Sequence, residues 1–169
     1  WLGCAIGGAA DPSSQPVKKL ADILGGEKQA TAIDSGIRNV VMAGMTNAYC
    51  SHILEMDDVD RDSISHPATP NIATAFAMSE YAAKTGRDLI EATVCGFEIM
   101  LRIGAAITPA HYKIFHTTAT TGVFGAAMVA GKMLGLNPTQ LNWALGNAGT
   151  MASGLWQFLQ DGGMSKFLH

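Results

Sequence analysis

The residues best suited to proton chemistry lie in two polar segments that interrupt long runs of small apolar residues. Segment 57–67 holds four aspartates, an arginine and His66, although charged residues make up only 15% of the chain. Segment 112–118 holds Lys113 and His116. Binding and catalytic groups are often carried on loops that rigid elements position. We therefore predict a proton-transfer enzyme whose chemistry resides in these segments.

The residue types in the two segments favour acid–base catalysis. A lone histidine is usually a hydrogen-bonded core residue, but here two histidines occupy polar segments, and His66 has carboxylates beside it. A neighbouring carboxylate can fix the tautomer of a histidine and raise its pKa toward the working range. Lys166 follows two glycines, and a lysine in such a place can bind a substrate carboxylate as a point charge. We interpret His111 and Lys113 as exposed loop residues.

Two metal-binding interpretations of the sequence fail on spacing. The alternating Asp58, Asp60 and Asp62 resemble a calcium loop, but such a loop needs glycine and glutamate where this chain has Ser63 and Thr69. An acidic loop that caps the following helix is the ordinary alternative. The chain's three cysteines, at positions 4, 50 and 95, are too far apart for a zinc or iron–sulfur motif. We expect no metal, and reduced cysteines in a cytoplasmic protein.

The hydrophobic pattern predicts an all-α, multi-helix domain with short extended connectors. Many alanines, 19 glycines and few aromatics indicate closely packed helices. The segment after Gly36 is expected to be helical apart from its turns, and residues 29–33 to form a strand or connector. His52 and Glu55 should form the polar end of one helix face beside the aspartate segment. Helices are predicted at 1–10, 17–24, 38–56, 69–84, 88–107, 120–134, 137–152 and 154–159.

Composition also limits the partners. A net charge of −3 with scattered Lys and Arg gives no nucleic-acid surface. Residues 114–131 carry no Lys, Arg, Asp or Glu, but His116 and several threonines predict a loop leading into a buried helix rather than a membrane span. Positive mean hydropathy with so little charge favours a partner that covers part of the surface, and a compact, alanine-rich fold is the alternative. Because the chain has no initial methionine and no helix-ending signal after Lys166, we expect it to be part of a longer protein.

Taken together, the polar segments and their flanks resemble the MmgE/PrpD family of 2-methylcitrate dehydratases and cis-aconitate decarboxylases. The order and spacing of the motifs, more than any single one, carry the resemblance over nearly the whole chain. The matching segments are 47–58, 65–67, 96–98, 102–104, 115–127, 144–149, 152–155 and 166–169.

The resemblance implies that residues 1–169 form most of the large N-terminal helical domain of a two-domain protein, without the smaller domain. It implies metal-free and cofactor-free chemistry on small polycarboxylates. The family's active-site residues carry over as His66, His116 and Lys166, with acidic residues at Glu55 and Asp58. Two positions depart from the pattern: Glu55 stands where the best-known members have aspartate, and Val59 stands where threonine is usual.

The function expected from this resemblance is a cytoplasmic, homodimeric lyase that dehydrates or decarboxylates a polycarboxylate through histidine acid–base catalysis. One alternative is an isomerase or epimerase of a dicarboxylate that uses the same residues. Another is a non-catalytic helical dimerisation module, or an inert fragment whose site is completed by the rest of the protein. We expect the 169-residue chain alone to have little activity, because a helical domain alone leaves the cleft open. Turnover by the purified chain would overturn that expectation.

Overall fold

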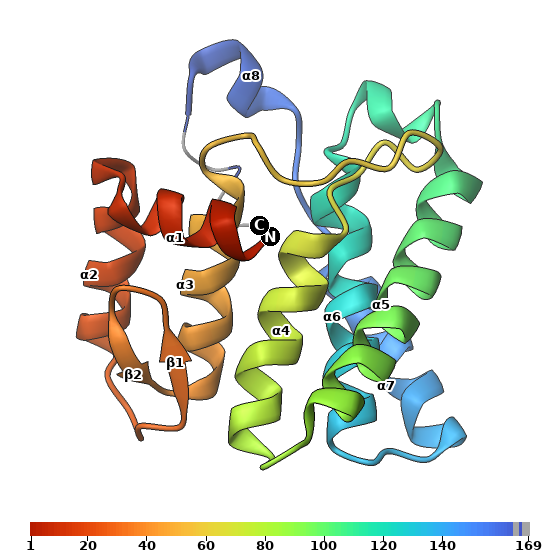
Figure 1. Cartoon of the computed structure of the whole chain (residues 1–169). Coiled ribbons are helices and arrows are strands. Elements are labelled where there is room, and N and C mark those ends of the chain that lie inside the picture. Colours follow the sequence, from red (N-terminus) through yellow and green to blue (C-terminus); the bar gives the residue numbers. More distant parts are fainter. Residues whose placement is uncertain (164–165, 167–169) are drawn as a thin grey trace.

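The computed structural model describes residues 1–163 and residue 166, and within them the chain is all-α apart from one small hairpin (Figure 1). This confirms the predicted fold class. The motif residues Phe167 to His169, and Met164 and Ser165 before Lys166, lie outside the described residues. The helices are α1 (Leu2–Ala10), α2 (Gln15–Leu24), α3 (Val40–His52), α4 (Ala68–Tyr81), α5 (Gly86–Ile107), α6 (Thr117–Met133), α7 (Pro138–Met151) and α8 (Gln157–Asp161), with 3-10 turns η1 (Pro12–Ser14) and η2 (His111–Lys113).

Two long helices begin at capping boxes, in which the first and fourth residues cap each other's backbone. Asn137 and Gln140 form the box before α7, as the sequence predicted. Thr85 and Asp88 form another before α5. The prediction that Gly86 ends a helix reaching Lys84 was therefore wrong. That glycine opens α5, because the threonine before it supplies a stronger local signal for a helix start.

The hairpin pairs β1 (Ala30–Ala32) with β2 (Gly36–Arg38) in antiparallel register. The sequence predicted an extended segment at β1 but wrongly assigned the residues of β2 to a turn and helix. Asn47 on α3 holds the first strand and the residue after it in place, and β2 is held by its pairing with β1. The Asn47 side chain accepts a hydrogen bond from the Ile33 N–H at 2.8 Å and donates one to the Thr31 carbonyl at 2.9 Å. These contacts are distant in sequence, so local patterns do not reveal them.

Helices α3, α4, α5 and α6 pack side by side, and α1, α2 and the hairpin lie beyond α3 (Figure 1). Their core is built mainly from alanine, methionine and valine. Small residues let α4, α5 and α6 approach closely around the fully buried Asn71. A Cβ on Gly96 or Gly125 would lie 2.2 Å or 2.4 Å from the Asn71 Oδ1 atom. Glycine is thus required at both positions.

This packing predicts that Gly125→Ala lowers the free energy of unfolding by about 1–3 kcal/mol, because the added methyl group overpacks the site around Asn71. Urea unfolding monitored by circular dichroism would measure the change. Gly146→Ala is the matched control, since Gly146 is also helical but exposed, and a methyl group added there would meet no atom within 4 Å. It should be neutral or stabilise by roughly 0.5–1 kcal/mol. Equal effects of the two substitutions would contradict the packing argument.

Candidate active site

The chain between α3 and α4, residues 53–67, crosses one end of the helix layer (Figure 1), and its His66 contacts Thr118 in the first turn of α6. The predicted helix 38–56 was too long, because α3 ends at His52. Glu55 then takes a left-handed backbone conformation, φ 53°, and its N–H donates to the His52 carbonyl. The helical pattern in the sequence continues past His52, but Asp57 folds back onto the His52 ring, which is incompatible with another helical turn.

His66 is fixed through its backbone. Its N–H donates to the Thr118 Oγ1 atom on α6 at 3.0 Å, and the carbonyl of the following Pro67 accepts from the buried Asn71 amide at 2.8 Å. Earlier in the segment, Ser63 packs so closely on Gly104 of α5 that a Cβ there would lie 2.5 Å from the serine Cβ. The position of His66 therefore depends on α4, α5 and α6 together.

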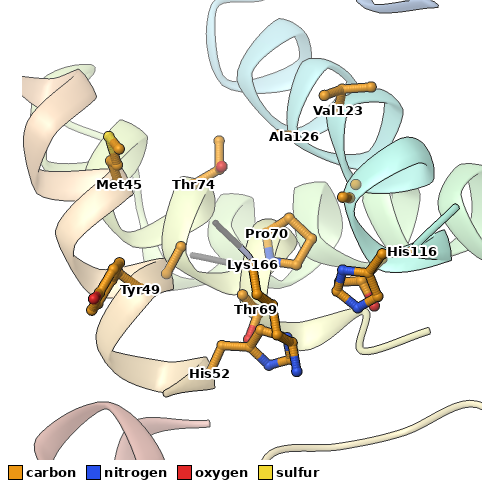
Figure 2. A pocket seen from close by; sticks show the side chains of 15 residues that line it. Met45, Tyr49, His52, Thr69, Pro70, Thr74, His116, Val123, Ala126 and Lys166 are labelled. Atoms are coloured by element: carbon orange, nitrogen blue, oxygen red, sulfur yellow. The ribbon is translucent and has the colours of Figure 1, made fainter. Parts of the chain in front are cut away.

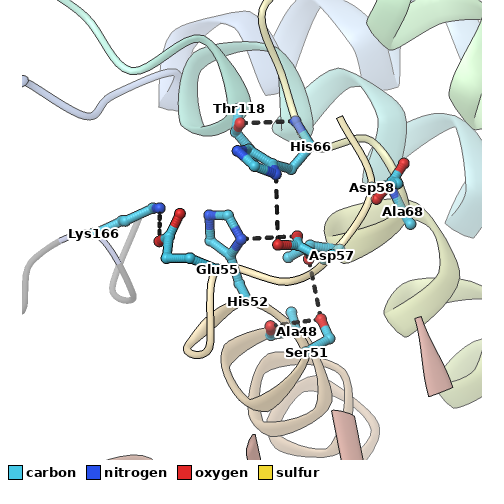
Figure 3. A network of polar contacts seen from close by, with 11 residues as sticks. Ala48, Ser51, His52, Glu55, Asp57, Asp58, His66, Ala68, Thr118 and Lys166 are labelled. Atoms are coloured by element: carbon cyan, nitrogen blue, oxygen red, sulfur yellow. Dashed lines mark hydrogen bonds and ion pairs between the residues drawn. The ribbon is translucent and has the colours of Figure 1, made fainter. Parts of the chain in front are cut away.

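Asp57 is the centre of a buried polar network (Figure 3). Its carboxylate is fully buried, and Oδ2 lies 2.8 Å from the His52 Nδ1 atom. The Thr69 hydroxyl donates to the same oxygen at 2.9 Å. The other oxygen, Oδ1, faces the His66 Nδ1 atom at 3.5 Å, an ion-pair distance longer than a well-formed hydrogen bond. One buried carboxylate therefore serves two imidazoles.

The charges in this network explain two pKa shifts. Burial alone would raise the pKa of Asp57, but its contacts with His52 and His66 and their charges outweigh burial and hold the pKa well below its usual range. In turn the Asp57 carboxylate raises the pKa of His66, although burial and the nearby Lys166 act in the opposite direction. Asp57 is thus ionised at neutral pH, and the imidazole of His66 binds its proton more tightly than a free histidine does.

Asp58 lies at the start of α4, apart from the cavity that the other predicted site residues line. Both of its carboxylate oxygens accept from the Ala68 N–H at 3.1 Å, at the start of α4. Burial raises the pKa of Asp58, and the backbone hydrogen bond opposes this shift. The acidic segment therefore caps the following helix, which begins at Ala68 rather than at the predicted Thr69.

His116 is the N-cap of α6 and is nearly buried, with 3% of its surface exposed. Its N–H donates to the Gly154 carbonyl at 2.9 Å, which brings the chain before α8 alongside it. As a result the Trp156 and Phe158 rings lie 5.0 Å and 5.5 Å from the imidazole, measured between ring centroids. His52 stacks nearly parallel to His116 at 6.1 Å. An apolar wall therefore supports His116 beside the polar network.

Lys166 reaches the same region from beyond α8. Its ammonium group forms an ion pair with the Glu55 carboxylate (Figure 3). The lysine side chain is largely buried, whereas half of the glutamate side chain is exposed.

Two cavities meet at His116 and Lys166. One, of about 390 Å³, lies between α3, α4 and α6 and is mostly apolar, with His52 and Thr69 on its wall (Figure 2). The other, of about 600 Å³, lies under α8. Four of the five predicted site residues line this second cavity: Glu55, His66, His116 and Lys166. Asp58 lines neither cavity.

Asp57 and His52 were not among the residues predicted for the site. His52 was placed at the polar end of its helix beside the aspartates, so its proximity to them was available as a signal. Asp57 could not be distinguished from its neighbours Asp58, Asp60 and Asp62, because only burial separates them. His111 is hydrogen-bonded to Thr120 at 2.8 Å and lines neither cavity.

His52, Asp57 and His66 are also the described residues whose types and spacing could ligate a metal ion, with their ligand atoms within 4.8 Å of one another. The hydrogen bonds that Asp57 forms with His52 and Thr69 account for the cluster without one. Cys50 is buried, which raises the pKa of its thiol to about 11 and makes it unreactive. No helix in the described part of the chain is long and apolar enough to cross a bilayer.

Comparison with known proteins adds an independent finding. Residues 1–169 match the family model of the MmgE/PrpD N-terminal domain. A cis-aconitate decarboxylase from Aspergillus terreus is 38% identical over 133 residues, which cover 75% of this chain and 27% of that enzyme. The cis-aconitate decarboxylase-like protein oryM from Aspergillus oryzae is 28% identical over 178 residues, 99% of this chain and 37% of its own length. The chain thus spans about a quarter to somewhat over a third of these relatives.

Proposed function

Because this chain belongs to the MmgE/PrpD family, we propose that it carries the acid–base residues of a lyase that acts on a small polycarboxylate. The observation that carries the proposal is the cavity under α8, where His66, His116 and Lys166 meet. The relative from Aspergillus terreus is a decarboxylase of cis-aconitate, and this supports the substrate class. The proposal applies to the complete protein.

The chemistry follows from the charges that the cavity offers. Removing a proton from a carbon beside a carboxylate builds negative charge on the substrate, and cationic groups must stabilise it. Lys166 would neutralise a substrate carboxylate after leaving Glu55. His66 and His116, which line the cavity under α8, provide one group to accept a proton and another to donate one.

In a dehydration, one histidine accepts the proton from carbon while the other protonates the departing hydroxyl group, so that water leaves and a double bond forms. In a decarboxylation, carbon dioxide leaves with its bonding electrons left on the substrate, and a histidine protonates the resulting carbanion. Both routes need the same cavity. We propose that neither needs a metal ion or an organic cofactor, because the two imidazoles supply the proton transfers and Lys166 supplies the positive charge.

An assay of the complete protein in deuterated water tests the function. Citrate, 2-methylcitrate, cis-aconitate and related dicarboxylates would be incubated with and without a chelator, and the products followed by NMR and mass spectrometry. Loss of water or carbon dioxide, unaffected by the chelator, is the expected result. Deuterium uptake without loss of water or carbon dioxide would favour an isomerase over a lyase. No reaction with any of these compounds would favour a non-catalytic helical module.

Lys166→Met is expected to raise KM by about 10-fold or more while leaving the fold intact, because a charge-assisted contact of about 1.5–3 kcal/mol to a substrate carboxylate would be lost. Steady-state kinetics with the substrate identified above would measure it. Lys113→Met is the matched control, since Lys113 lines neither cavity. An unchanged KM in Lys166→Met would remove this lysine from substrate binding.

We further propose that the protein is a homodimer in the cytoplasm. Large apolar side chains remain on the surface in numbers that favour a covering partner, among them Val41, Ile90, Val94, Trp143, Met151 and Leu159, each more than half exposed. Light scattering of the complete protein would give its mass in solution.

A further inference from the structure

The buried network contains a carboxylate that the proposed chemistry does not use. Asp57 lines neither cavity, and its side chain is fully buried. Burying a carboxylate is costly unless positively polarised groups surround it. The groups that surround Asp57 are His52 and Thr69 on one oxygen and His66 on the other. A buried charge thus lies between two imidazoles, of which His66 lines the cavity under α8 and His52 lines the cavity between α3, α4 and α6.

The two atoms that face each other across the 3.5 Å gap, Asp57 Oδ1 and His66 Nδ1, are both buried, and neither forms a well-formed hydrogen bond within the described part of the chain. The Asp57 carboxylate and the Asp58 backbone are polar neighbours of the His66 imidazole. A small movement of the imidazole would join the two atoms. Catalytic hydrogen bonds are often long before substrate binds and shorten in the complex. The distance between Asp57 Oδ1 and His66 Nδ1 can therefore shorten to that of a hydrogen bond with little movement.

We propose that Asp57 is the positioning residue of His66, which it orients by accepting the Nδ1–H so that Nε2 faces the cavity. This inference rests on the proposed function, in which His66 transfers a proton. His52 occupies the second oxygen and keeps the carboxylate from rotating away, while Thr69 anchors that same oxygen to α4. Asp57 itself does not touch the substrate.

The effect on titration follows from all the charged groups near His66. Asp57 and Asp58 approach from its own segment and favour the protonated imidazole. Lys166 opposes protonation. His52 at the end of α3 lies 4.7 Å away between ring centroids, and Glu55 and His116 line the same cavity. Replacing Asp57 with asparagine removes the nearest negative charge, so the pKa of His66 should fall.

Asp57→Asn in the complete protein tests the proposal. An asparagine amide would present its NH₂ group to His66 and favour the wrong tautomer, so kcat should fall by about 10-fold or more with little change in KM. The limb of the pH–rate profile that reports His66 should move to lower pH whether His66 acts as acid or base. Asp60→Asn is the matched control. Asp60 belongs to the same segment, but its carboxylate binds Ser63, and no hydrogen bond or ion pair joins it to a histidine in the described part of the chain.

A second measurement does not depend on turnover. Diethyl pyrocarbonate reacts with neutral imidazole, so the rate of His66 modification against pH, read by peptide mass spectrometry, gives its pKa. We expect a value above 6.5 in the wild-type protein and a lower one in Asp57→Asn. If the substrate assay finds no reaction, the proposed function fails while this titration still tests the contact.

Three outcomes would overturn the proposal: a His66 pKa at or below 6.5 in the wild-type protein, an unchanged pKa in Asp57→Asn, or an unchanged kcat in that variant. Should Asp57→Asn fail to fold, the pKa of His66 in the wild-type protein still tests the contact. An equal loss of kcat in Asp60→Asn would assign the effect to the segment as a whole, and this too would contradict a specific role for Asp57.

Discussion

His66→Ala is expected to lower kcat by about 10²- to 10⁴-fold, the usual contribution of a positioned acid–base group. The variant should remain folded, because the anchoring contacts of this residue involve its backbone N–H and the carbonyl of Pro67 rather than its ring. Its side chain is 22% exposed, so truncation leaves a space that water can enter. Steady-state kinetics and circular dichroism of the complete protein would measure both effects.

The control for this substitution is His111→Ala. His111 lines neither cavity, and burial lowers its pKa, in contrast to the raised pKa of His66. Its removal should cost the hydrogen bond to Thr120 and some stability, but little kcat. An unchanged kcat in His66→Ala would exclude His66 from the mechanism, whatever the control does.

His116→Ala should lower kcat by a similar factor, and unlike His66→Ala it should also destabilise the fold. This imidazole is nearly buried, and Trp156 and Phe158 fix its ring against the cavity. Truncation leaves a void beside two aromatic rings, so we also expect the free energy of unfolding to fall by about 2 kcal/mol. Kinetics and urea unfolding on the same preparation would separate the chemical loss from the structural one.

The double variant His66→Ala/His116→Ala tests whether the two histidines act together. If both proton transfers belong to one step, removing the second histidine costs little once the first is gone, because residues that act as a unit are strongly non-additive. The kcat of the double variant should then be close to that of whichever single variant has the lower kcat. Fully multiplicative losses would indicate that the histidines serve separate steps.

Most of the helical framework could be predicted from the sequence because its signals are local. Apolar spacing located the helices, and the Asn137–Gln140 box gave the start of α7. Of the five residues predicted for the site, Glu55, His66, His116 and Lys166 line one cavity in the structure, and their catalytic roles remain predictions. Their motifs carry enough order and spacing to bring them together through the family resemblance.

Only the tertiary structure distinguished the aspartates. Asp57, Asp58 and Asp60 have the same side chain within four positions, yet the first lies between two imidazoles, the second caps α4 and the third binds Ser63. Their environments depend on how α3, α4, α5 and α6 pack around the segment, and that packing involves residues distant in sequence. The sequence determined which groups are available for proton transfer. The packing decided which carboxylate is buried, because burial and the hydrogen-bond partner of a charge are set by neighbours in space.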